Sequence, residues 1–181
     1  LKWCQVIMSE RRDIVGVQTL RNQMMSSSLV STVSITIIAL VAAFLVNLGT
    51  SKLPHLSLAP EVIPIGHKMF VVIICFIIAF FCFMQSLRAY NHGSYLIGLP
   101  LEAEYYVTAD YVCTILNRGA DYYTLGSRFF YLALITLMWL FGSIPAAVMV
   151  LCLLPVLHRS DRAPHPHLHH NHGRGKRAVS A

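Results

Sequence analysis

Charged residues are scarce in this sequence, and the shortage indicates its class. Only 12% of the 181 residues are Asp, Glu, Lys or Arg, whereas 56% are hydrophobic. A soluble globular domain contains about 25% charged and about 45–50% apolar residues. The missing charge, together with a mean hydropathy of +0.60, therefore indicates a lipid solvent rather than a larger core. The length is that of one domain.

Several chemical motifs are also missing. The sequence has no Gly-rich phosphate loop, no His-Glu-x-x-His, no Gly-x-Ser-x-Gly and no Cys-x-x-Cys pair. Its loop carboxylates have only His92 near them and are interpreted as solvated charges and a helix cap: Glu102, Glu104, Asp110 and Asp121. We interpret the five cysteines as small packing residues. We therefore expect no enzymatic activity and no cofactor.

Three long apolar runs contain no charge: Leu29–Leu48, Met69–Leu87 and Phe129–Leu157. Twenty helical residues rise about 30 Å, which is the thickness of the hydrocarbon core of a bilayer. The pattern predicts an all-α, multi-span helical membrane protein with three transmembrane helices, at 29–48, 69–87 and 129–157. No Asp, Glu, Lys, Arg or His lies inside these runs, which argues against a proton- or ion-coupled transporter formed by this chain alone.

The third run has 29 residues and, as a straight helix, is about 43 Å long. We expect one tilted span with a kink at Pro145. The alternative is a re-entrant hairpin that reverses at Gly142–Pro145. Each arm of that hairpin would have about fourteen residues, too few to cross the core.

The segments between the runs predict interfacial structure. Apolar residues at spacings of three and four make residues 1–28 an amphipathic juxtamembrane helix, either at the membrane surface or packed on another loop. A short helix over Ala109–Arg118 is expected to end at Gly119, inside a soluble loop at 88–128. Ser31, Thr32 and Thr36 are interpreted as a helix contact face, with a polar conduit as the alternative.

Residues 158–181 form a polar tail that we expect to be disordered. Five imidazoles in it have spacings compatible with Zn²⁺, Cu²⁺ or Ni²⁺: His165, His167, His169, His170 and His172. With three spans, the fourteen Lys and Arg residues divide seven to seven between the two sides of a membrane. The Lys and Arg residues near span ends favour a cytoplasmic position for 1–28 and 88–128, because such residues are enriched on the cytoplasmic side.

Two motifs resemble a known family. The first is Val17-Gln18-Thr19-Leu20-Arg21-Asn22, followed by Met25-Ser26-Ser27-Ser28; the second is Leu125-Gly126-Ser127-Arg128-Phe129-Phe130-Tyr131, followed by Trp139-Leu140-Phe141-Gly142. Over residues from about 3 to 161, the chain resembles the plant and bacterial family catalogued as domain of unknown function 599. The resemblance implies a small multi-span helical membrane protein, usually with a further span ahead of Leu1. It implies no established activity, and it leaves out the histidine-rich tail.

The motif residues suggest a site. If the starts of the first and third spans meet at one membrane face, Gln18, Arg21, Asn22 and Arg128 are placed to bind lipid phosphate or backbone carbonyls. The alternative is plain anchoring by cations at span ends. We expect a non-enzymatic, multi-pass membrane protein that assembles with lipids, with itself or with other membrane proteins, and not with nucleic acid. The alternatives are a channel or transporter subunit, and metal handling through the tail.

Overall fold

The computed structural model describes residues 6–8, 10, 12–50, 65–98 and 109–161. Four long helices account for nearly all of these residues: α2 (Asp13–Thr50), α3 (Ile65–Ile97), α4 (Ala109–Trp139) and α5 (Ser143–Asp161). Residues 6–8 add a helical turn, and no strand occurs in the described ranges. The predicted all-α class is confirmed.

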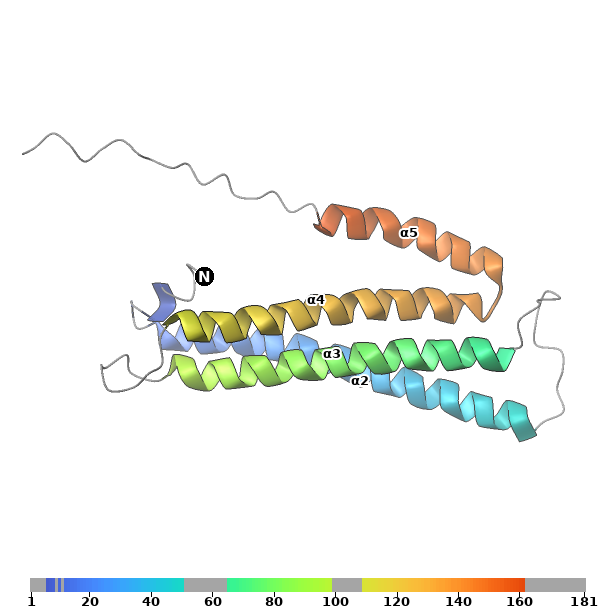
Figure 1. The fold of residues 1–181 in the computed structure, drawn as a ribbon, viewed down its shortest axis with the longest axis horizontal. Coiled ribbons are helices and arrows are strands. Elements are labelled where there is room, and N and C mark those ends of the chain that lie inside the picture. The colour runs from blue at the N-terminus through green and yellow to red at the C-terminus, as the bar shows by residue number, and fades with distance from the viewer. Residues whose placement is uncertain (1–5, 9, 11, 51–64, 99–108, 162–181) are drawn as a thin grey trace, which may run out of the picture.

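The helices lie side by side, with α3 packed against both α2 and α4 (Figure 1). Successive helices run in opposite directions. The start of α2, the end of α3 and the start of α4 therefore lie together at what we call the Asp13 end. The other end of the bundle, where α3 begins and α4 finishes, is the Ile65 end.

Within the described ranges, two helices, not three, are long and apolar enough to cross a membrane. They are Asp13–Asn47 in α2 and Ile65–Ile97 in α3, with mean hydropathies of 2.6 and 2.7 over their most apolar windows. The prediction of three transmembrane helices is therefore wrong in its count. The physical reason lies in α4, because Arg118, Asp121 and Arg128 interrupt its apolar residues.

The third apolar run is divided between two helices. The α4 helix ends at Trp139, where Leu140, Phe141 and Gly142 donate backbone hydrogen bonds to carbonyls three residues earlier. Gly142 has φ of 140°, and α5 begins at the next residue. The chain reverses there, so α5 runs back beside α4 (Figure 1). The expectation of a single kinked span over 129–157 is wrong.

The reversal at Gly142 agrees with the hairpin alternative, but its first arm, α4, is longer than the roughly fourteen residues expected from the apolar run. The helix does not start at the first apolar residue but at Ala109, twenty residues earlier. The expected stop of a short helix at Gly119 is also wrong, because Gly119 lies inside α4 and is buried. In the same way, α2 continues from Asp13 through the first apolar run, with no boundary at residue 28.

Small residues at heptad spacing bring α3 and α4 close together. Buried positions seven apart are Val112, Gly119, Gly126 and Ala133 on α4, and Val72, Ala79, Ser86 and Gly93 on α3. A Cβ atom at Gly126 would lie 3.1 Å from the Cys82 Cβ and 3.2 Å from the Phe83 ring. A seven-residue repeat keeps one face of each helix on its neighbour, and small residues allow close backbone approach.

Two buried clusters hold the bundle, one at each end. The cluster at the Asp13 end consists of Ile7, Met8, Leu20, Tyr90, Ile97, Val112, Cys113 and Leu116. The cluster at the Ile65 end consists of Val41, Met69, Val72, Cys75, Phe76 and Ala133. Between them, the Phe83 ring meets the Tyr123 ring edge to face, with centroids 5.5 Å apart. None of the described α5 side chains is buried.

Candidate functional site

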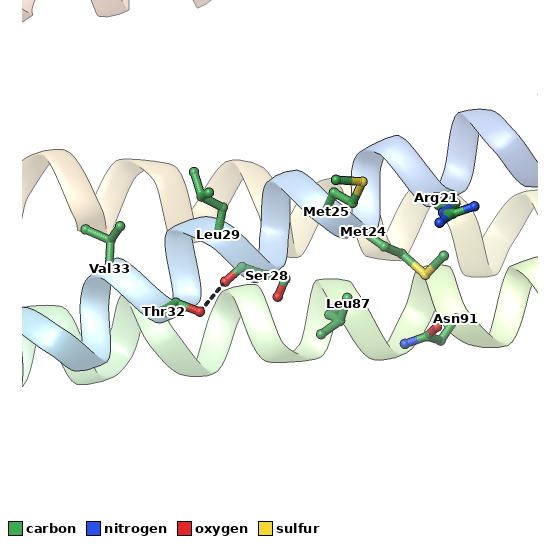
Figure 2. A pocket seen from close by; sticks show the side chains of 9 residues that line it. All are labelled: Arg21, Met24, Met25, Ser28, Leu29, Thr32, Val33, Leu87 and Asn91. Carbon is green, nitrogen blue, oxygen red and sulfur yellow. Dashed lines mark hydrogen bonds between the residues drawn. The ribbon is translucent and has the colours of Figure 1, made fainter.

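An open groove of about 540 Å³ lies between α2 and α3. Figure 2 shows the side chains that line it. They are Arg21, Met24, Met25, Ser28, Leu29, Thr32 and Val33 from α2, and Leu87 and Asn91 from α3. The two α3 residues are far from the others in sequence, and the antiparallel packing of α3 on α2 brings them together.

The groove is polar at one end and apolar at the other. Arg21 on α2 and Asn91 on α3 both lie toward the Asp13 end, with Met24 between them in this view, and Leu29 and Val33 lie toward the opposite end (Figure 2). The Thr32 hydroxyl donates a 2.9 Å hydrogen bond to the Ser28 carbonyl. Its donor is therefore satisfied within α2, and the apolar end of the groove presents mainly hydrocarbon.

Three exposed arginines lie at one level of the bundle, and we call them the arginine belt: Arg21, Arg88 and Arg118. Arg21 is eight residues from the start of α2, Arg88 is nine from the end of α3, and Arg118 is nine from the start of α4. Each therefore lies about 12–14 Å from the Asp13 end. From Arg88 to the start of α3 at Ile65 is about 35 Å of helix, slightly more than one hydrocarbon core.

Of the four motif residues predicted to share a site, three lie close together on α2, and Arg128 lies apart from them on α4. Gln18, Arg21 and Asn22 are all exposed, and their spacing places them on one side of α2. Only Arg21 lines the groove. Arg128 is exposed on α4, ten residues beyond Arg118 and thus about 15 Å past the arginine belt toward the Ile65 end. It does not share a site with Arg21.

Buried and half-buried hydroxyls link the three central helices near the groove. The Ser86 hydroxyl donates to the Gly119 carbonyl at 2.8 Å, inside the α3–α4 contact. The Ser26 and Tyr123 hydroxyls lie 3.0 Å apart and join α2 to α4. Ser31 is buried, in keeping with a helix contact face, whereas Thr36 is exposed and donates to the Thr32 carbonyl.

Lys68 marks the Ile65 end. Its side chain is 4% exposed, and its Nζ lies 4.8 Å from the centre of the Trp139 ring. A cation over an indole face is attracted by the ring quadrupole. This contact ties the beginning of α3 to the end of α4, close to the turn at Gly142.

The remaining sequence candidates do not form a site among the described residues. His165, His167, His169, His170 and His172 lie outside the described part of the chain, as do Glu102 and Glu104. Asp110 and Asp121 are exposed on α4. Within the described ranges, no group of three His, Cys, Asp or Glu side chains has the arrangement of a metal site.

The fold and the groove define the class of this protein. It is a helical bundle with two candidate membrane spans and an amphipathic groove. The model of one family, described as "Protein of unknown function, DUF599", matches residues 1–166. The chain belongs to that family, as the two motifs predicted. No curated protein and no solved structure matches the chain.

Proposed function

We propose that this chain is a multi-pass integral membrane protein that works by assembling with lipids and membrane partners rather than by catalysis. The observation that carries the proposal is the poor burial of its most apolar helices. In the most apolar stretch of 18 residues, only 17% of the α2 residues and 33% of the α3 residues are buried inside the bundle. The core helix of a soluble protein hides its apolar residues, whereas these helices present theirs outward.

Many large apolar side chains on both helices are exposed. Leu40 and Val46 on α2 are 68% and 67% exposed, and Phe70 and Phe81 on α3 are 60% and 61% exposed. Soluble monomers rarely expose contiguous apolar patches larger than a few hundred Å². A surrounding bilayer removes that cost, because hydrocarbon tails solvate these side chains.

The arginine belt supports a definite position in the bilayer. Cations at span ends bind headgroup phosphates and are enriched on the cytoplasmic side. With the belt at the cytoplasmic headgroups, the charge-free parts of α2 and α3 cross the hydrocarbon. The Asp13 end then projects about 12 Å into the cytoplasm. Arg21 is the member of the belt with a groove beside it, and the groove lining suits an amphiphile.

Membrane extraction tests the proposal. Membranes from cells that make the chain are washed with alkaline carbonate and centrifuged, and the pellet is then dissolved in mild detergent. We expect the chain to stay in the carbonate-washed pellet and to be released by detergent, because hydrocarbon contacts do not depend on charge. Release into the carbonate supernatant would contradict the proposal.

A channel or transporter subunit is the second candidate, and one observation favours it. Thr32 and Thr36 are exposed on the otherwise apolar side of α2, at a spacing that puts them on one stripe. In an oligomer, this stripe would line either a contact between subunits or a narrow polar path through the assembly. Both hydroxyls donate to carbonyls of α2 itself, so the stripe offers oxygen acceptors. Metal handling by the histidine-rich tail rests on the sequence alone.

A further inference from the structure

The α2–α3 groove has the polarity of a single amphiphile. Its polar end contains a guanidinium and a carboxamide, and its other end contains branched aliphatic side chains. The apolar run of α2 begins at Leu29, and that of α3 ends at Leu87. The groove therefore lies across the level at which headgroups give way to acyl chains.

The polar end favours an anion. The Arg21 guanidinium presents several N–H donors in a planar fork that fits two phosphate oxygens. The Asn91 amide, at the same end of the groove, adds further donors. Arg88 lies three residues from Asn91 on the surface of α3, so a second cation is near. None of the nine lining residues is acidic.

The rest of the groove suits one hydrocarbon chain. Met25 lies between its two ends and Met24 lies at the polar end (Figure 2), and methionine side chains adapt their shape to what they contact. Leu87 forms the α3 wall, opposite the α2 side chains (Figure 2). A groove open along its length admits an acyl chain from the surrounding bilayer without any movement of the helices.

We propose that this groove is a binding site for one anionic phospholipid. The headgroup phosphate binds Arg21 and Asn91, and one acyl chain lies along Leu87, Leu29 and Val33. The proposal rests on the membrane location proposed above and names the lipid class. The net positive charge of the arginine belt selects an anionic headgroup over a zwitterionic one.

Four forms of the full chain test the proposal: the wild type, Arg21→Gln, Arg118→Gln and Leu87→Trp. Arg118→Gln is the matched control, because it removes the same charge at the same level but away from the groove. Leu87→Trp fills the groove and leaves the charge unchanged. Each form is purified in detergent, and its helix content is compared by circular dichroism. Each is then mixed with phosphatidylglycerol or phosphatidylcholine and examined by native mass spectrometry.

We expect the wild type to retain one phosphatidylglycerol in preference to phosphatidylcholine. Arg21→Gln should weaken phosphatidylglycerol retention about tenfold, as expected for loss of a hydrogen-bonded charge. Arg118→Gln should leave retention unchanged. Leu87→Trp should reduce retention of both lipids, because the acyl path is blocked.

Three results would overturn the proposal. Equal losses from Arg21→Gln and Arg118→Gln would assign binding to diffuse surface charge. Normal retention by Leu87→Trp would show that no groove is used. A dimer of the lipid-free wild type that Leu87→Trp abolishes would assign the groove to a second copy of the chain. Carbonate extraction of the same variants separates these failures from failure of the membrane proposal, since a chain without a lipid site still stays in the membrane.

Discussion

At the residue scale, α3 and α4 pack closely because glycine, which has no side chain, occupies positions in their contact. Gly126 meets the Cys82 Cβ and the Phe83 ring at distances that leave no room for a larger residue. Ser86 adds a buried hydrogen bond to the Gly119 carbonyl in the same contact. Close packing and interhelical hydrogen bonds are two of the forces that associate helices in lipid.

Gly126→Leu should therefore destabilise the bundle. Overpacking of a tight contact costs about 1–3 kcal/mol, which should lower the thermal midpoint in detergent. Gly66→Leu is the control, because a Cβ at Gly66 would meet only the Leu45 side chain, at 4.0 Å. Both variants replace a helical glycine with leucine. Equal thermal midpoints of the two variants would contradict a close contact at Gly126.

The glycine pattern is visible in the sequence only when the glycines are considered together. Gly119 looked like the end of a short helix because glycine often follows a helix. The repeat of Gly119, Gly126 and Ala133 at intervals of seven is the signal that would have corrected that interpretation. By contrast, Arg21 was found from sequence, because its position ahead of a charge-free run is a local feature.

At the element scale, the turn between α4 and α5 decides the topology. Gly142 has φ of 140°, a conformation that residues with a Cβ rarely adopt. Pro145 is the third residue of α5, where the missing N–H has no helical acceptor to lose. The turn is followed by a helix that contacts mainly α4.

Gly142→Ala should loosen α5 and leave the other helices in place. Strained backbone of this kind costs about 1–3 kcal/mol, so the amides of α5 should exchange with deuterium about tenfold faster or more. Ser143→Ala is the control, since Ser143 is exposed and already helical. Hydrogen exchange followed by mass spectrometry resolves α5 from α3. Faster exchange in both helices would show that the turn is not a local feature.

The sequence predicted helices but not where they divide. A charge-free run marks where a helix contacts apolar surroundings, and it does not mark where the helix starts or stops. The α4 helix begins in a segment rich in Tyr and charge and ends inside an apolar run. The sequence also could not predict the groove, because Leu87 and Asn91 come near Arg21 only through the packing of α3 on α2.

At the scale of the whole molecule, the reversal at Gly142 changes the distribution of charge. The described part of the chain has six arginines and one lysine: Arg12, Arg21, Arg88, Arg118, Arg128, Arg159 and Lys68. Lys68 lies at the Ile65 end, and Arg159 ends a helix that runs back toward the Asp13 end. Arg12, Arg21, Arg88 and Arg118 lie in the half of the bundle next to the Asp13 end, whereas Arg128 lies past its middle. These positions favour the Asp13 end as the cytoplasmic side proposed above.

Cysteine labelling tests this orientation. In a background without native cysteines, Ile14→Cys, His67→Cys and His158→Cys each place one thiol at an exposed position. In sealed vesicles treated with an impermeant maleimide, the thiols at 14 and 158 should react from the same side, and the thiol at 67 from the other. Reaction at 158 together with 67 would instead support a single third span. Reaction of all three from one side would contradict membrane crossing.

The weak attachment of α5 bears on the order in which the protein assembles. Neither buried cluster includes a residue of α5, and Leu140 is the last residue packed on either of them. Because a chain emerges from the ribosome N-terminus first, α2, α3 and α4 have every partner they need before Ser143 is synthesised. Helix α5 is added after both buried clusters can form, and its loss in a shortened product would leave those clusters intact.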